Sequence, residues 1–323
     1  MRSVQTSERF PLASVKPLDG LRRYRAYCLE ATRAALAGAS RRRERSPVDG
    51  GPLAPCGTID GLAYARCPRS GSLFLSELPE RASWAALLAD VTRYRHSPEA
   101  FHTGLAQSRA DHVYAPKLAW IQDTLRLQEL VRPTALEVTT PPSDLTTLLR
   151  DSRAFADVET ANEMALLAEP LPREGSSRIG AAVLLESLDR VDDPNALLRA
   201  VAARLSTGGL VFVTALVSSG FDLAVLGLRN VYLYPPDRAN CFSLQGLAAL
   251  LTGAGFDLLE VSTPGVLDVE IVRAHLEEEP ALPLSAFERQ VVQAEPDTQQ
   301  AFQAFLQQRG LSSFARLVGR KRA

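Results

Sequence analysis

The spacing of apolar residues along the chain changes near residue 133. Before it, apolar positions recur at helical intervals from Leu18 to Ala37 and through residues 82–130, which predicts amphipathic helices. After it, short apolar runs alternate with amphipathic segments, and the run from Ile179 to Leu185 is the clearest candidate for a buried strand. Such alternation predicts an α/β domain with a doubly wound, mostly parallel sheet.

Helix-start signals support this pattern. Asp193 followed by Pro194 is a typical N-cap with proline at the first helical position, and Ser243 precedes another apolar helical face. We predict strands at residues 134–139, 154–159, 179–185, 210–216, 256–263 and 314–319.

The chain divides into parts that differ in composition. The first holds an amphipathic helix and a basic run, Arg41 to Arg45, which we expect to be a solvated linker. The second is rich in proline and glycine and predicts a small module of hairpins. The third is expected to be helical, and the fourth is the α/β domain with a helical insertion at about 276–310. The predicted boundaries are 1–45, 46–80, 81–130 and 131–323.

Composition narrows the functional classes. The 323 residues include 36 basic and 37 acidic side chains, so no overall field draws the protein to nucleic acid or to an anionic membrane, and we expect neither partner. No apolar stretch reaches the length of about 18 residues that a membrane span needs, and the first residues lack a signal-peptide pattern. We therefore expect a cytoplasmic protein.

Four segments together resemble a known family: Leu185 to Pro194, Leu205 to Thr214, Tyr234 to Asp237 and Gly253 to Phe256. In this order they are similar to class I S-adenosylmethionine-dependent methyltransferases that carry a zinc-ribbon module before the catalytic domain, a type that methylates sugars and natural products. The resemblance implies a Rossmann-like sheet with an antiparallel last strand and S-adenosylmethionine as cofactor.

The ribbon positions depart from the family. The resemblance places four zinc ligands at Ser46, Asp49, Cys67 and Ser70, and three of these are not cysteine. Serine is a poor ligand for Zn²⁺, which prefers thiolate and imidazole. We therefore expect no bound zinc.

The cofactor loop departs as well. Glu137 stands where the family has its acidic residue, but the loop after it, Thr139 to Ser143, has no glycine and two prolines. Proline removes backbone N–H donors, so the cofactor is not expected in the usual mode. The resemblance implies an acid at the end of the second strand that holds the ribose hydroxyls. Asp157 or Glu159 could fill this position, and the alternative is that each is an exposed acid at a strand end.

Histidine is missing where the family would place it. Asp189 and Arg190 replace Glu-His after one strand, Arg238 replaces a histidine after Pro-Pro-Asp, and Phe314 replaces another. Arginine stays charged and cannot act as a base. The four histidines lie elsewhere in the chain, at His96, His102, His112 and His275.

Three hypotheses follow. The first is a catalytically inactive methyltransferase-like protein without cofactor, acting as a partner subunit in a homo- or hetero-oligomer, for example with an active paralogue. The alternative is an active S-adenosylmethionine-dependent enzyme for a sugar or natural-product intermediate, with Asp189, Tyr234 and Arg238 as catalytic candidates and Glu137 and Thr139 at the cofactor. The third is a cleft in which Arg190 and Arg238 hold an anion.

Overall fold

The computed structural model describes residues 13, 15, 17–97, 104–140, 143–170 and 178–322. Its centre is a six-stranded sheet in the order β11-β12-β9-β8-β6-β7. Neighbouring strands among β7, β6, β8 and β9 are parallel, whereas β12 is antiparallel to both β9 and β11. The predicted Rossmann-like sheet with an antiparallel last strand is confirmed. The strands are β6 Thr134–Val138, β7 Asp157–Ala161, β8 Ile179–Leu185, β9 Leu205–Leu216, β11 Phe256–Ser262 and β12 Phe314–Lys321.

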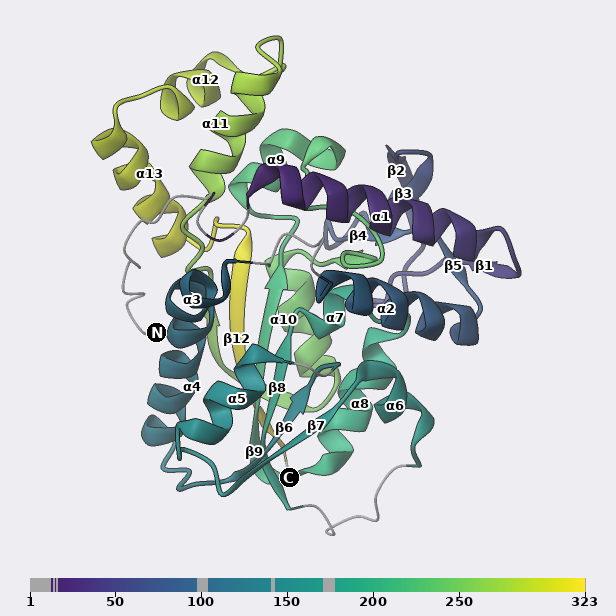
Figure 1. Cartoon of the computed structure of the whole chain (residues 1–323), viewed down its shortest axis with the longest axis vertical. Coiled ribbons are helices and arrows are strands. Elements are labelled where there is room, and N and C mark those ends of the chain that lie inside the picture. The colour runs from purple at the N-terminus through teal and green to yellow at the C-terminus, as the bar shows by residue number, and fades with distance from the viewer. Residues whose placement is uncertain are drawn as a thin grey trace.

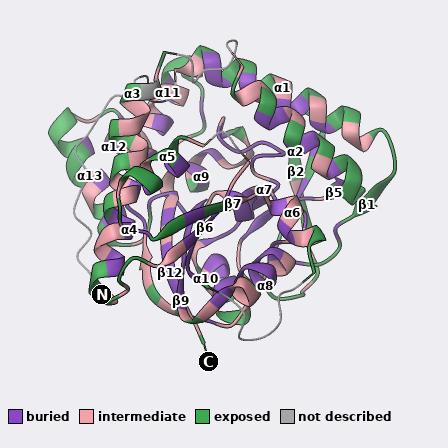
Figure 2. Cartoon of the chain, turned by 60° about the horizontal axis from the view of Figure 1, so that its bottom comes forward, coloured by how far each residue is buried: buried purple, intermediate pink, exposed green. Residues whose placement is uncertain are grey.

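Helices cover both faces of this sheet. On one face Trp120 and Leu149 pack with the strand residue Phe212, and on the other Leu198 and Leu250 pack with strand residues of the sheet. Figure 2 shows the buried residues gathered around β6, β9 and α10. The first face carries α4 (Ala115–Leu127) and α5 (Asp144–Asp151), and the second carries α6 (Glu163–Ala168), α8 (Pro194–Arg204) and α10 (Leu244–Gly253).

Polar side chains start these helices as the sequence indicates. Asp193 accepts a hydrogen bond from the backbone N–H of Ala196 at the start of α8, and Ser243 accepts one from Gly246 at the start of α10. Both bonds satisfy an N–H group that has no partner within the helix.

The hairpin module is joined by strand pairing to a segment far along the chain. A second sheet has the order β10-β4-β3-β2, so β10, which follows the Pro-Pro-Asp turn, pairs with the hairpin strand β4. A further pair joins β1 to β5. These strands are β1 Ser40–Arg42, β2 Ala54–Ile59, β3 Leu62–Arg66, β4 Leu73–Leu75, β5 Glu77–Pro79 and β10 Asn240–Cys241.

The basic run is exposed at four of its five residues, as a solvated linker would be, and departs from that prediction at Arg43. Arg43 is buried, and its guanidinium donates to the side chain of Asn240 at 2.7 Å and to the carbonyl of Asp192 at 3.0 Å. Arg41 forms an ion pair with the buried Asp192 carboxylate. Arg43 departs from the prediction because its acceptors, Asn240 and Asp192, are buried in another part of the chain.

Most of the remaining helices, α1, α2, α9, α11, α12 and α13, build a third apolar cluster at one end of the sheet. α1 crosses that end, and α11, α12 and α13 lie together at the top of Figure 1. No helix of the described segments is both long and apolar enough to span a bilayer. These helices are α1 Leu18–Leu36, α2 Arg81–Arg95, α3 Ala106–Arg109, α7 Ser187–Arg190, α9 Phe221–Leu226, α11 Asp268–Glu278, α12 Ala286–Val292 and α13 Pro296–Gln308, with a π-helical turn η2 at Ala110–Tyr114 and a 3-10 turn η3 at Gly227–Arg229.

Candidate functional site

A cavity of about 1390 Å³ opens at the carboxyl ends of the parallel strands. Val138 and Thr139 line it at the end of β6, and Leu185, Glu186 and Ser187 line it at the end of β8. Loops at this edge of a parallel sheet are the usual place for a ligand in α/β folds. The volume exceeds the roughly 300–1,000 Å³ of most small-molecule sites.

Glu137 is held by the first turn of the following helix. It is buried in β6, and its carboxylate accepts hydrogen bonds from the hydroxyls of Ser143 and Thr146. Burial raises the pKa of Glu137, against the lowering effect of these two bonds. Thr139 also lines the cavity, and its N–H donates to the carbonyl of Ala161. Pro141 and Pro142 of the predicted cofactor loop lie outside the described residues.

The acid predicted at the end of the second strand is misplaced. β7 begins at Asp157 and ends at Ala161, so Asp157 lies at the edge of the sheet away from the cavity, where it pairs with Thr134. Glu159 lies in mid-strand and is exposed, and neither acid lines the cavity. The strand starts three residues later and ends two residues later than its apolar pattern indicated.

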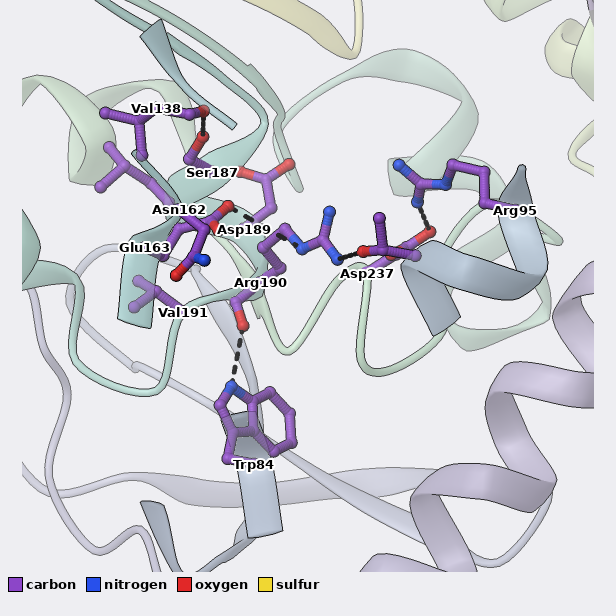
Figure 3. A network of polar contacts seen from close by, with 12 residues as sticks. Trp84, Arg95, Val138, Asn162, Glu163, Ser187, Asp189, Arg190, Val191 and Asp237 are labelled. Atoms are coloured by element: carbon purple, nitrogen blue, oxygen red, sulfur yellow. Dashed lines mark hydrogen bonds and ion pairs between the residues drawn. The ribbon is translucent and has the colours of Figure 1, made fainter. Parts of the chain in front are cut away.

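The acid that the cavity does present after β7 is Glu163. Asn162 caps α6 by accepting from the N–H of Ala165, and Glu163 follows it, 4% exposed and lining the cavity. Its carboxylate lies 3.9 Å from Nε of Arg190. Figure 3 shows Arg190 between Glu163 and Asp237, with its carbonyl bonded to the indole of Trp84.

Asp237 is the centre of a buried charge network. Nη2 of Arg95 lies 2.5 Å from its carboxylate, and Arg95 stands on the far side of Asp237 from Arg190 in Figure 3. Burial alone would raise the pKa of Asp237, but Arg95, Arg190 and Arg238 together lower it. Asp237 therefore stays ionised and orders three arginines at one side of the cavity.

Arg238 pairs with two carboxylates. Its Nη2 lies 2.5 Å from Glu186 and its Nη1 lies 3.5 Å from Asp189. Asp189 is fully buried, accepts from the N–H of Leu216 and does not line the cavity. Burial raises its pKa well above the ordinary value. Asp189 is thus placed to hold Arg238 and β9, and it does not face a substrate.

Tyr234 lines the cavity beside the aromatic ring of Tyr24. Burial, followed by the charge of Asp237, raises the pKa of Tyr234 well above its ordinary value. The phenol therefore keeps its proton at neutral pH and is a poor base. Of the catalytic candidates from the sequence, the structure places Tyr234 and Arg238 at the cavity and Asp189 behind it.

Two histidines of the predicted helical segment that precedes the sheet in the chain reach the cavity. His96 ends α2 and His112 lies in η2, and both are exposed cavity-lining residues. Burial of the ring and the charge of Arg95 lower the pKa of His96. His275 lies on α11, where its Nδ1 contacts the carbonyl of Ile271, and His102 lies outside the described residues.

The four ribbon positions form a hydrogen-bonded cluster. The Cys67 thiol lies 3.6 Å and 3.7 Å from the two carboxylate oxygens of Asp49 and accepts from the N–H of Ser70. Burial raises the pKa of Cys67, but bonds with Ser46 and Ser70 outweigh it and lower the pKa. The turn that holds Asp49 and the turn that holds Cys67 and Ser70 therefore contact each other. Among the described residues, no group of three His, Cys, Asp or Glu side chains is arranged to hold a metal.

Glu186 is a site residue that the sequence reasoning missed. It follows the last residue of β8, lines the cavity and has a left-handed backbone with φ of 62°. Non-glycine residues rarely adopt this conformation, and such strain is concentrated at functional sites. An acid directly after the most apolar strand was the available sequence signal.

The comparison with protein families shows which class of protein the chain belongs to. A model described as a methyltransferase domain matches residues 67–261. The chain belongs to this methyltransferase family. The match includes the last residues of the hairpin module, the strand ends that border the cavity and most of β11. It favours the alternative of a working enzyme over the predicted inactive one.

Individual relatives are more distant. The ubiquinone biosynthesis O-methyltransferase of Xanthomonas axonopodis pv. citri is 33% identical over 100 residues, which cover 29% of this chain and 42% of that protein, so the chain spans less than half of this relative. The Burkholderia thailandensis 1,6-didemethyltoxoflavin-N1-methyltransferase is 13% identical with a TM-score of 0.44 and covers 84% of this chain and 100% of that chain. The Haemonchus contortus phosphoethanolamine N-methyltransferase 2 is 12% identical with a TM-score of 0.39, and the match covers 63% of this chain and 53% of that chain.

Proposed function

We propose that the protein is an active S-adenosylmethionine-dependent methyltransferase with a rebuilt cofactor pocket, acting on a small-molecule acceptor such as a sugar or natural-product intermediate. The observation that carries this proposal is the open cavity at the carboxyl ends of β6 and β8 in a chain of the methyltransferase family. The core that surrounds this edge is intact, because the apolar clusters on both faces of the sheet are complete.

The cavity edge fits the charge of this cofactor. Three carboxylates face it from consecutive strand ends: Glu137 in β6, Glu163 after β7 and Glu186 after β8. S-adenosylmethionine carries a sulfonium cation and a ribose diol, and carboxylates suit both groups. We assign Glu163 to the ribose hydroxyls in place of the misplaced Asp157 and Glu159, while Glu137 orders the loop through Ser143 and Thr146.

Residues at the cavity and directly behind it would each have a separate role in methyl transfer. S-adenosylmethionine, when bound, supplies an activated methyl group to a nucleophile of the acceptor. The Glu186 carboxylate takes the proton that the acceptor hydroxyl or amine loses. Arg238 orients that carboxylate through its 2.5 Å contact, and Asp189 in turn fixes Arg238. Tyr234, which keeps its proton, is a hydrogen-bond donor to the acceptor.

The test is transfer of a labelled methyl group from S-adenosylmethionine to a small-molecule extract of the producing cells. We expect wild-type protein to label a product and Glu186→Gln to lower the rate by about 100-fold, the lower range for loss of a general base. Glu169→Gln is the control, because Glu169 is an exposed acid that pairs with Arg204 outside the cavity. No labelled product with wild-type protein would contradict the proposal.

The ion pairs favour one second candidate. Arg190 and Arg238 occupy positions where the family resemblance expects histidine, and both are paired with cavity carboxylates. This candidate is a non-catalytic member of the family that acts as a partner subunit, in a homo- or hetero-oligomer with an active paralogue. Such a protein would keep a site in which ion pairs neutralise the charges. This candidate predicts no binding of S-adenosylmethionine and co-purification of a second polypeptide.

A further inference from the structure

A group of basic side chains lines the same cavity from the side of β12. We call Arg109, Lys117 and Arg316 the cation cluster, and they come from α3, α4 and β12. Glu163 stands at the other side, at the end of β7. β12 is four strands from β7 in the sheet order, a separation of about 19 Å at the usual strand spacing. The cation cluster is therefore remote from the acid that we assign to the cofactor ribose.

Aromatic rings hold these cations in place. The Lys117 ammonium lies 6.0 Å from the ring centroid of Tyr114 and 5.4 Å from that of Phe314. Arg316 lies over the ring of Trp120 at 5.2 Å, and Arg109 over Tyr114 at 5.5 Å. Ring faces attract cations but bring no counter-charge. The cluster is thus a basic patch with apolar walls.

No ion pair joins the cation cluster to an acid among the described residues, although the charges of Glu186 and Glu260 act on Lys117 and Arg316 from a longer distance. Lys117 is only 6% exposed, and no hydrogen bond or ion pair joins its ammonium to any of the described residues. Nε of Arg316 is likewise buried with no acceptor among them. Burying an unpaired cation is costly. Arg109 is half-buried and donates to the carbonyl of Val15 and the hydroxyl of Tyr114, neither of which carries a charge. One buried unpaired ammonium with two guanidinium groups beside it therefore favours the entry of an anion.

Two further observations agree. Burial, with Arg109, Arg316 and Arg238 nearby, lowers the pKa of Lys117 to about 8, although Glu186 opposes this effect. Tyr114 is delivered by the π-helical turn η2, which interrupts the helix between α3 and α4. Such turns occur frequently at functional sites.

We propose that the cation cluster binds the anionic group, a carboxylate or a phosphate, of a small aromatic acceptor molecule. The anion would lie between Lys117 and Arg316, and its ring against Tyr114, Trp120 and Phe314. Because Glu186 lines the same cavity and its charge acts on Lys117, the nucleophile of such an acceptor would be held within reach of the proposed base. The acceptor role rests on the proposed function, whereas anion binding does not.

Calorimetry with defined probes tests this assignment. Benzoate carries a carboxylate and phenyl phosphate carries a phosphate, each on a benzene ring. Benzyl alcohol is the neutral comparison. We expect at least one anion to bind at least tenfold more tightly than benzyl alcohol, and Lys117→Met and Arg316→Met each to weaken that anion at least tenfold. Arg126→Gln on the same helix is the control, because Arg126 is exposed, pairs with Asp123 and does not line the cavity.

Thermal melting separates a binding role from a structural one. Without ligand, Lys117→Met should melt no lower than wild type, because it removes an unpaired buried charge, and it should lose the stabilisation that the anion gives wild type. Equal binding of benzyl alcohol and both anions, or anion affinity unchanged in Lys117→Met, would overturn the proposal.

Two conditions complete the test. Anion affinity should fall above about pH 8, since Lys117 must be protonated to attract the anion. The other charges that act on Lys117 are those of Glu186, Arg109, Arg316 and Arg238. The charge of Glu260 acts on Arg316. Saturating S-adenosylhomocysteine should leave anion binding in place. Competition would mean that the cluster holds the carboxylate of the cofactor, and would overturn the acceptor assignment. Anion binding without any S-adenosylhomocysteine binding would contradict the proposed function alone.

Discussion

Nη2 of Arg238 lies 2.5 Å from the carboxylate of Glu186, and this contact joins the turn after β8 to the Pro-Pro-Asp turn. The same guanidinium reaches the fully buried Asp189 at 3.5 Å. Arg238 is therefore a cation shared by an acid at the cavity and an acid behind it. A histidine at this position could carry a proton, but an arginine can only hold the two acids in place.

Removing this shared cation should destabilise the fold. We expect Arg238→Gln to lower the free energy of unfolding by about 3 kcal/mol, the low end for a broken buried pair, since Glu186 is partly exposed and Asp189 can take up a proton. Adding Asp189→Asn should recover part of the loss, because the amide needs neither a counter-charge nor the uptake of a proton. Urea unfolding of both variants measures this, and a double variant no more stable than the single one would contradict it.

Asp222 should make stability depend on pH. Burial and the neighbouring Asp268 raise the pKa of Asp222 to about 7, whereas an unfolded aspartate titrates near 3.9. Between about pH 4 and 7 the folded state keeps a proton that the unfolded state releases, so this contribution to stability is complete below pH 4 and is lost as the pH rises to 7.

Urea midpoints at pH 5 and pH 8 measure that effect. Asp222→Ala should show a smaller difference between the two midpoints than wild type, whatever its absolute stability. Asp237, whose pKa is lowered, gives a contribution of opposite sign that lies mostly below pH 4. A pH dependence that is identical in Asp222→Ala and wild type would rule out this role for Asp222.

The ribbon cluster should accept zinc once its thiols are restored. Cys67, Asp49 and Ser70 already lie within hydrogen-bonding contact, so the triple variant Ser46→Cys, Asp49→Cys, Ser70→Cys should bind one zinc ion per chain, in the tetrahedral Cys₄ arrangement. Wild-type protein purified alongside should contain none. Metal analysis after dialysis measures both, and stoichiometric zinc in the wild type would refute the expectation.

Asn240 should be essential for joining the hairpin module to the main sheet. It is fully buried, its amide donates to the carbonyls of Leu188 and Val191, and its oxygen accepts from Arg43. Asn240→Ala leaves these groups without partners, and we expect a loss of about 3 kcal/mol or more in urea unfolding. Asn195→Ala, which removes one bond to Pro47, is the matched control and should cost about 1 kcal/mol. Equal losses in the two variants would count against the role of Asn240.

The sheet could be predicted because its signals are local. Ile179 to Leu185 became β8 with the predicted ends, and the caps Asp193 and Ser243 start helices as expected. The second strand was predicted to start three residues and to end two residues too early because its exposed edge position leaves a weak apolar pattern. Because of that error, Asp157 and Glu159 were expected at the end of the strand, whereas Asp157 begins it and Glu159 lies in its middle.

The site could be predicted only in part, since it depends on contacts between distant segments. Arg43 looked solvated in a run of charges, but its acceptors, Asn240 and Asp192, lie about 150 or more positions away in the chain. Lys117 is unremarkable in the helical pattern, and only the fold brings it beside Phe314. Pairings of this kind have no local sequence signature.

The most direct test of the account is equilibrium binding of S-adenosylmethionine to the full-length protein by calorimetry. The account predicts one site with a dissociation constant between roughly 1 μM and 1 mM, the range typical of enzyme substrates, and at least tenfold weaker binding by Glu163→Gln with no change in Glu169→Gln. No binding by correctly folded wild-type protein would contradict it and leave the non-catalytic partner as the function to pursue.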